Sequence, residues 1–176
     1  MSAGAQSAPR PSWWARLFGQ RYAAVEAVAA LPADGPVELE GMAEVLDEEL
    51  IDPLTGESAV AVHVRARIAG AVSRAYGGPA GTSMAFETSC RDQVDFILRD
   101  ASGGALIRLS PGGDVQDFVA ELRRRHGLEA EMESESIPVG ARVRVRGRVE
   151  SRGTGQGPLR GGPYESVIVA DEVVRA

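Results

Sequence analysis

Four arginine side chains repeat at every second position in the C-terminal part of the chain. They are Arg142, Arg144, Arg146 and Arg148, with Val143, Val145 and Gly147 between them. Side chains alternate between the two faces of a β-strand, so one face of this segment is apolar and the other carries four positive charges. Guanidinium groups at this spacing could bind successive phosphates of a single-stranded nucleic acid that lies along the β-strand.

A second segment with alternating charges offers these arginines an internal partner. Four glutamates alternate just before the turn at 136–140, namely Glu129, Glu131, Glu133 and Glu135. If the two segments form an antiparallel hairpin with Glu135 opposite Arg142, every cross-strand pair has opposite charge. Two glutamates of an earlier strand, Glu38 and Glu40, could flank the same arginines in a barrel. We therefore favour a structural role for the arginines over an anion-binding role.

Nucleic-acid binding through the arginine face is the alternative. Stacking of bases needs aromatic side chains, and the sequence has none between Phe118 and Tyr164. The formal net charge of −6 also argues against non-specific binding of nucleic acid.

The other residues that could do chemistry are too few for a catalytic or metal site. Cys90 is the only cysteine, His63 and His126 are the only histidines, and the chain contains no lysine. One thiolate cannot hold a zinc ion or an iron–sulfur cluster, and a Schiff base needs a lysine. No nucleotide-binding loop or nucleophile elbow is present. We therefore expect no enzymatic activity, no metal and no cofactor.

The N-terminal segment carries candidate contact residues of another kind. Ser12 suits a helix N-cap, apolar side chains follow at helical spacing as far as Val28, and Pro32 ends the pattern. The helix could lie on a membrane surface, dock on a partner protein, pack across the rest of the chain or pair with a second copy. Its candidate contact residues are Trp13, Trp14, Leu17, Phe18 and Tyr22.

The remaining segments are mostly typical of strands. Strands are expected over residues 37–45, 59–69, 94–99, 105–109, 142–149 and 165–174, and a helix capped by Asp114 over residues 114–126. An OB barrel has five strands and carries a helix between the third and the fourth, which is the slot that this helix occupies. The sequence thus predicts a mainly β fold, an OB-like β-barrel with one internal α-helix and an N-terminal amphipathic helix.

The expected domain organisation has three parts. Residues 1–12 are rich in Ser, Ala, Gly and Pro and are expected to form a disordered tail. Residues 13–36 form the N-terminal helix and a linker, and residues 37–176 form the barrel domain. No run of about 18 apolar residues is present, so we expect no membrane span.

Several short phrases, in order, resemble one known family. They are Leu39-Glu40-Gly41, the turn Asp52-Pro53-Leu54-Thr55-Gly56, the hairpin from Phe96 to Gly103, and Ile137-Pro138-Val139-Gly140 followed by Val143, Val145 and Gly147. Over residues 37–150 this set resembles the GIDE-type, or beside-a-membrane, domain of membrane-anchored mitochondrial E3 ubiquitin ligases and many bacterial proteins. The resemblance implies a binding module. It does not imply ligase activity, because one cysteine cannot supply the zinc ligands of a RING domain.

These observations together predict a class of function. We expect a non-enzymatic protein-interaction or scaffold module with an unidentified protein partner, located in the cytoplasm. Contact of the N-terminal helix with the inner face of a membrane and pairing of two copies are open alternatives. The alternative from another class is an OB protein that binds nucleic acid through the strand face of Arg142–Arg148.

Overall fold

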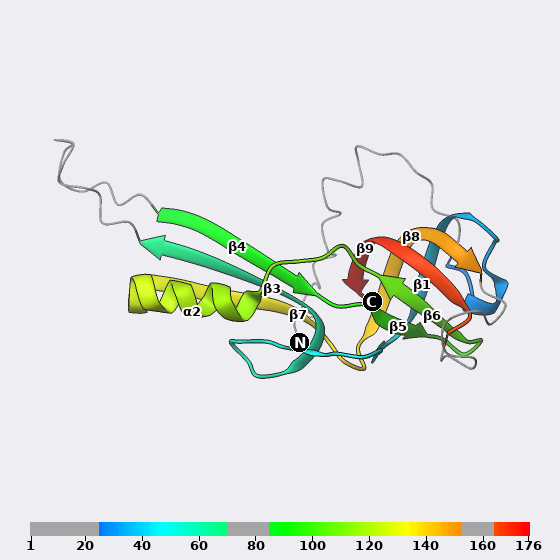
Figure 1. The fold of residues 1–176 in the computed structure, drawn as a ribbon, viewed down its shortest axis with the longest axis horizontal. Coiled ribbons are helices and arrows are strands. Elements are labelled where there is room, and N and C mark those ends of the chain that lie inside the picture. Colours follow the sequence, from blue (N-terminus) through cyan, green and yellow to red (C-terminus); the bar gives the residue numbers. More distant parts are fainter. Residues whose placement is uncertain (1–24, 70–84, 153–163) are drawn as a thin grey trace, which may run out of the picture.

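The computed structural model describes residues 25–69, 85–152 and 164–176. These residues form a closed β-barrel and an elongated arm that extends from it (Figure 1).

Five strands close the barrel. They are β1 (Gly35–Val45), β5 (Phe96–Arg99), β6 (Gly104–Arg108), β9 (Ser166–Arg175) and β8 (Arg142–Arg152), in this order around the barrel. All neighbours are antiparallel except β6 and β9, which are parallel. Counted in chain order, the strands are arranged 1-2-3-5-4 around the barrel, with a helix between the third and the fourth, as in an OB barrel. The predicted mainly β fold with an OB-like barrel is confirmed.

The alternation of apolar side chains explains why these segments close into a barrel. Val37 and Leu39 of β1 and Val143 and Val145 of β8 are each fully buried in one core cluster. Phe96 of β5 lies in the same cluster. Burial of each such side chain is worth roughly 1.5–3 kcal/mol, so the inward face of the arginine strand is a main contributor to barrel stability.

The N-terminal end of the described chain packs into this barrel. Val28 and Leu31 are buried in the barrel core, and Val28–Ala30 form a 3-10 turn, η1. For these residues the prediction of an α-helix is therefore corrected. The reason is a long-range contact with the turn between β5 and β6: the backbone N–H of Val28 donates to Asp100 Oδ2 at 2.8 Å and that of Ala29 donates to Ser102 Oγ at 3.0 Å. The expected candidates Trp13, Trp14, Leu17, Phe18 and Tyr22 lie outside the described residues.

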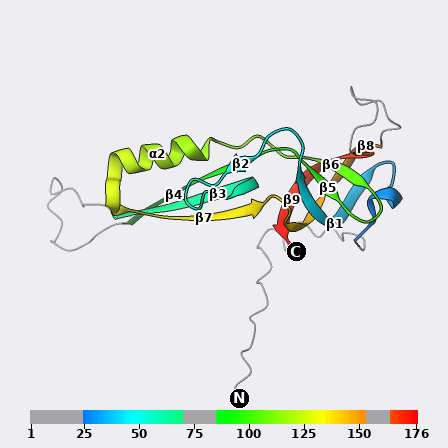
Figure 2. The ribbon, with the colours of Figure 1, turned by 90° about the horizontal axis from the view of Figure 1, so that it is seen from below.

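The arm is a four-stranded sheet with one helix. The central strand β3 (Ser58–Ala69) pairs with β4 (Ala85–Gln93) on one side and with β7 (Ala130–Pro138) on the other, and the short β2 (Leu50–Ile51) pairs with its first residues. Helix α2 (Val115–His126), followed by the 3-10 turn η3 (Gly127–Glu129), covers one face of the sheet, and no helix of the described residues lies on the other face (Figure 2).

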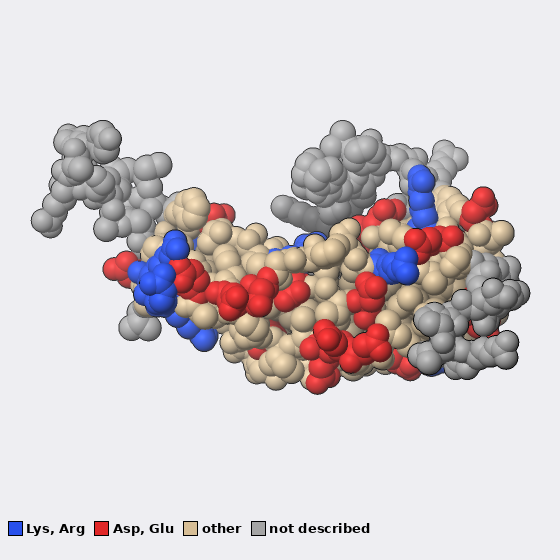
Figure 3. Space-filling view, in the orientation of Figure 1, with Lys and Arg blue, Asp and Glu red and all other residues tan. Residues whose placement is uncertain are grey.

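Helix α2 forms where its sequence predicts it. Asp114 accepts a hydrogen bond from the N–H of Asp117 at 2.9 Å, which caps the helix, and Gly127 with φ 56° ends it. Val115 and Val119 pack on Val62 and Val64 of β3. Arginines of the last turn interact favourably with the helix dipole, and Figure 3 shows basic side chains gathered at this end of the arm.

The hairpin that the sequence predicts between Glu129–Glu135 and the arginine strand is wrong. Strand β7 pairs with β3, where Glu133 lies opposite Arg65 and Glu131 opposite Arg67. Strand β8 pairs with β1 and β9 instead. The turn at Val139–Gly140 carries the chain from the arm to the barrel, since the N–H of Val139 donates to Ser58 O and that of Gly140 to Ala43 O.

Candidate interaction surface

The side of the arm sheet that no described helix covers is made of polar and charged side chains. Alternate residues of β3 point away from α2, and the register of the sheet places polar residues of both neighbouring strands beside them. We call this surface the arm face. It consists of His63, Arg65 and Arg67 of β3, Glu87, Ser89 and Arg91 of β4, and Glu131, Glu133 and Glu135 of β7.

The charges of the arm face are arranged in columns along the strands. The central strand contributes arginines, and the outer strand β7 contributes only glutamates to this face. Arg65 lies 3.6 Å from Glu133 and 2.5 Å from Glu135, and both glutamate side chains are more than 70% exposed, at 73% and 72%. Exposed ion pairs contribute about 0–1 kcal/mol each, so these pairs order the side chains more than they stabilise the fold.

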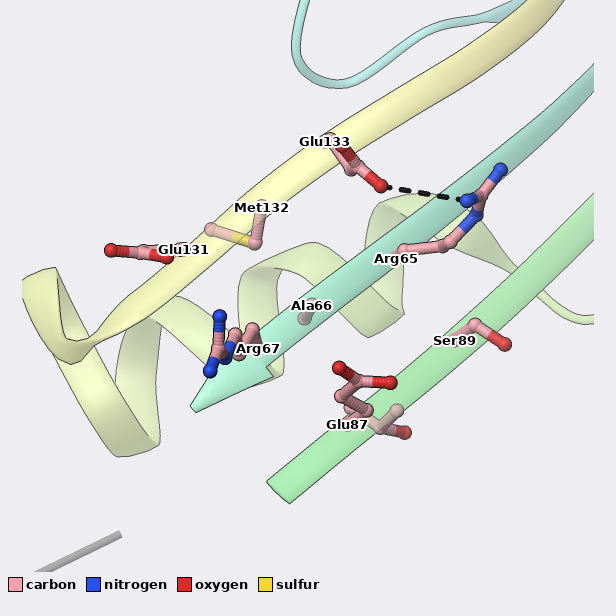
Figure 4. A pocket seen from close by; sticks show the side chains of 9 residues that line it. Arg65, Ala66, Arg67, Glu87, Ser89, Glu131, Met132 and Glu133 are labelled. Carbon is pink, nitrogen blue, oxygen red and sulfur yellow. Dashed lines mark ion pairs between the residues drawn. The ribbon is translucent and has the colours of Figure 1, made fainter. Parts of the chain in front are cut away.

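A shallow hollow of about 670 Å³ lies over the distal half of the arm face. Figure 4 shows Arg65 and Arg67 in its centre, with Glu131 and Glu133 on one side and Glu87 and Ser89 on the other. The Arg67 guanidinium makes no ion pair with any described residue, although both neighbouring strands carry a glutamate at its level. The hollow therefore offers both hydrogen-bond donors and acceptors to a ligand.

The pKa values of His63 and Cys90, both in the arm sheet, are each shifted toward the neutral form of the side chain. Partial burial, with Arg91 and Arg65 nearby, lowers the pKa of His63, which lies on the arm face. Burial, with Asp92 and Asp114 nearby, raises the pKa of the Cys90 thiol, which lies under α2. Neither group is arranged as an activated nucleophile.

The arginine strand is occupied by ion pairs within the barrel. Arg142 Nε lies 2.7 Å from Glu40 Oε1, and Arg144 reaches Glu40 at 3.0 Å and Glu38 at 3.5 Å. Arg146 bridges Glu38 and Glu172, each at 3.1 Å. The expected flanking by Glu38 and Glu40 is confirmed, and it uses three of the four arginines predicted as an anion-binding alternative.

Arg148 differs from the other three arginines of this strand. It lies across from Pro36 and Val169, which offer no charge, and it makes no ion pair with a described residue. One exposed guanidinium does not form a phosphate track, because such a track needs a row of available charges.

The ion pairs of Glu40 predict a dependence of stability on pH. Hydrogen bonds from Arg144 and Arg142 lower the pKa of Glu40 from its ordinary value of 4.5. Its contribution to folding is therefore fully present above pH 4.5 and is lost as the pH falls through the lowered pKa of the folded state. We expect Glu40→Gln to unfold at lower urea concentration than the wild type at pH 7, and this difference to shrink below pH 4.5.

Urea titrations monitored by circular dichroism at a series of pH values measure this difference. Glu57→Gln is the control, because this exposed side chain makes no ion pair with a described residue, and it should leave the midpoint unchanged at every pH. A difference for Glu40→Gln that persists undiminished at acid pH contradicts the assigned pairs.

The outer surface of β5 and β6 corresponds to the ligand-binding face of an OB barrel. It carries Ile97 and Leu106, both buried, while Arg99 and Arg108 pair with Glu44 and Glu150 at 2.8 and 2.6 Å. No outward-facing described residue of these two strands is aromatic. Without an aromatic platform, this face offers bases no stacking surface.

Comparison with known protein families, curated proteins and solved structures finds no match to this chain. Within residues 25–69, 85–152 and 164–176, no group of three or more His, Cys, Asp or Glu side chains could hold a metal ion. In the same ranges, no helix has the length and apolar character needed to cross a membrane. The resemblance to the GIDE-type domain thus stays a prediction.

Sequence reasoning missed the contribution of β4 to the arm face. The sequence predicts no element for Glu87, Ser89 and Arg91, because β4 is of mixed polarity and follows a Gly-rich segment. The signal that could have found the strand is the alternation of Phe86, Thr88 and Cys90 with these three polar residues.

Proposed function

We propose that this protein is a non-enzymatic interaction module whose contact surface is the arm face. The proposal rests on the position of the arm in the chain, since its elements are inserted into two connections between barrel strands. Strands β2, β3 and β4 lie between the first and second barrel strands, and α2 and β7 lie between the third and fourth. OB barrels bind their ligands with the first of these connections, among others, so the arm enlarges a part of the fold that is suited to recognition.

The construction of the arm supports this proposal. The arm has apolar clusters of its own, with α2 packed on one face of the sheet, so the sheet is supported from that side and no described helix covers the other face. A rigid surface with ordered charges of both signs gives specificity in protein recognition, because a partner must match the pattern. The proposal also agrees with the binding-module role that the resemblance to the GIDE-type domain implies.

Site-specific photo-crosslinking in cells that express the protein tests this proposal. A photoreactive amino acid replaces exposed Ser89 on the arm face or, as control, exposed Ala120 on α2. We expect discrete crosslinked protein adducts from position 89 and none from position 120. Equal adduct patterns from both positions, or no adduct from position 89, contradict the arm face as the contact surface.

A further inference from the structure

The outer edge of β7 is a regular strand edge without a partner among the described residues. Strand β7 pairs with β3 on one side, and no described residue pairs with its other side. Its register with β3 is unbroken from Ala130 to Ile137, and its only proline, Pro138, ends the strand. Bulges and prolines block an edge through its backbone and are absent from Ala130–Ile137, so the backbone of this edge can accept another strand, and its charged side chains decide which strand fits.

The opposite edge of the arm sheet is different. The segment that leads into α2 runs beside β4, where the N–H of Gly113 donates to Arg91 O at 2.7 Å and the Gln93 side chain donates to Ser110 O. A Cβ atom at Gly112 would lie 2.3 Å from Arg91 O, which shows how closely the two segments approach. The inner half of β4 is therefore closed, whereas β7 has no described partner along its outer edge over its whole length.

The side chains of β7 select the kind of strand that could be added. On the arm face the strand presents only Glu131, Glu133 and Glu135, all exposed, and a single guanidinium, that of Arg65, pairs with two of them. Side chains directly opposite each other on antiparallel strands lie about 4.5–5.5 Å apart at Cβ, and like charges there are destabilising. A second copy of β7 would place glutamate against glutamate, whereas a strand with alternating basic residues would neutralise all three.

We propose that β7 binds an extended basic segment of a partner protein, which adds to the arm sheet as a further strand. The bound segment carries Arg or Lys at every second position, on the side of the arm face, and small or β-branched residues between them. Backbone hydrogen bonds to the edge supply affinity and the alternating charges fix the register. This inference rests on the proposed function and names the class of partner that the arm face recognises.

Fluorescence anisotropy with a synthetic peptide tests the proposal. The probe is a labelled peptide as long as β7, 9 residues, with Arg at every second position and Thr or Val between. The control peptide has the same composition with its arginines contiguous. We expect the alternating peptide to bind the full-length protein about tenfold or more tightly than the control peptide. Hydrogen exchange should slow at residues 130–138 when it binds.

A pair of variants with the same charge change locates the site. The triple variant Glu131→Arg, Glu133→Arg, Glu135→Arg is expected to weaken binding of the alternating peptide by about tenfold or more. The matched control is Asp47→Arg, Glu48→Arg, Glu49→Arg, which reverses three exposed acids of the β1–β2 connection and should have a much smaller effect. The comparison of the two peptides on the wild type needs no variant, so the proposal stays testable if a variant fails to fold.

Three results overturn the inference: equal affinity for the two peptides, equal effects of the two triple variants, or exchange protection outside β7. Self-association of the protein that the β7 triple variant abolishes also overturns it, because a second copy would then occupy the edge. If position 89 crosslinks but the alternating peptide fails, only the partner class is wrong and the arm face remains a contact surface. If neither succeeds, the proposed function fails as well.

Discussion

Gly147→Ala is expected to destabilise the barrel by about 3 kcal/mol or more, the upper range for overpacking. A Cβ atom at position 147 would lie 2.2 Å from Val169 O and 2.9 Å from Ala170 Cα. Both are backbone atoms of β9, so relief requires the two strands to separate at the bulge between Arg146 and Gly147. Because β8 is held between β1 and β9, this separation would open the barrel.

Thermal unfolding monitored by circular dichroism measures this effect. A loss of this size corresponds to a decrease in Tm of about 6–12 °C for a chain of this length. Gly103→Ala is the matched control, because its Cβ would lie 3.6 Å from Val28 Cγ1, an ordinary contact, and its Tm should change by at most about 2 °C. If both variants have the Tm of the wild type, the backbone of β9 does not lie as close to Gly147 as the structure places it.

The barrel could be predicted from the sequence because its signals are local. Val143, Val145 and Gly147 alternate with arginines over one strand, and Val37 and Leu39 do the same with glutamates, so both strands have an apolar face. The helix at Val115–His126 carries its own cap and stop signals. Such patterns fix which segments are strands and helices and which face is buried.

The pairing of the charged strands could not be predicted, because it is a choice between equivalent partners. The glutamates of β7 can be neutralised by the arginines of β8 or by those of β3, and short-range charge patterns do not distinguish the two. In the structure, apolar packing distinguishes the two pairings. Met132 and Ala130 of β7 pack beside Ala66, Ile68 and α2, whereas β8 needs both of its neighbours to close the barrel core.

The arm face could not be predicted either, because it depends on the same choice of partner for β7. It combines residues of three strands that come from two separate insertions, and only the pairing of β3 with β7 brings Arg65 to Glu133. A predicted hairpin between β7 and β8 leaves β3 without this neighbour, so the arm sheet does not form in that prediction. The wrong partner for β7 therefore excludes the arm face from the prediction.

Glu38→Arg is expected to destabilise the barrel by about 2–3 kcal/mol. Glu38 is buried, with only 9% of its side chain exposed, and it accepts from Arg146 and pairs with Arg144. Reversal of its charge leaves adjacent guanidinium groups without their shared carboxylate. Removing one partner of a fully buried ion pair costs about 3–5 kcal/mol. The expected loss is smaller here because water reaches the Arg144 and Arg146 side chains, which are 40% and 32% exposed.

A second substitution decides between the two possible partners of the arginine strand. Adding Arg146→Glu to Glu38→Arg should recover part of the loss, because it restores opposite charges across β1 and β8, although the new carboxylate then faces Glu172. Glu133→Arg alone should cost about 1 kcal/mol or less, since Glu133 is exposed and pairs with Arg65 of the arm. Urea unfolding of the single and double variants measures these differences. If Glu133→Arg proves as costly as Glu38→Arg, and Arg144→Glu repairs it, the strand pairs with β7 after all and the arm face does not exist in the form described.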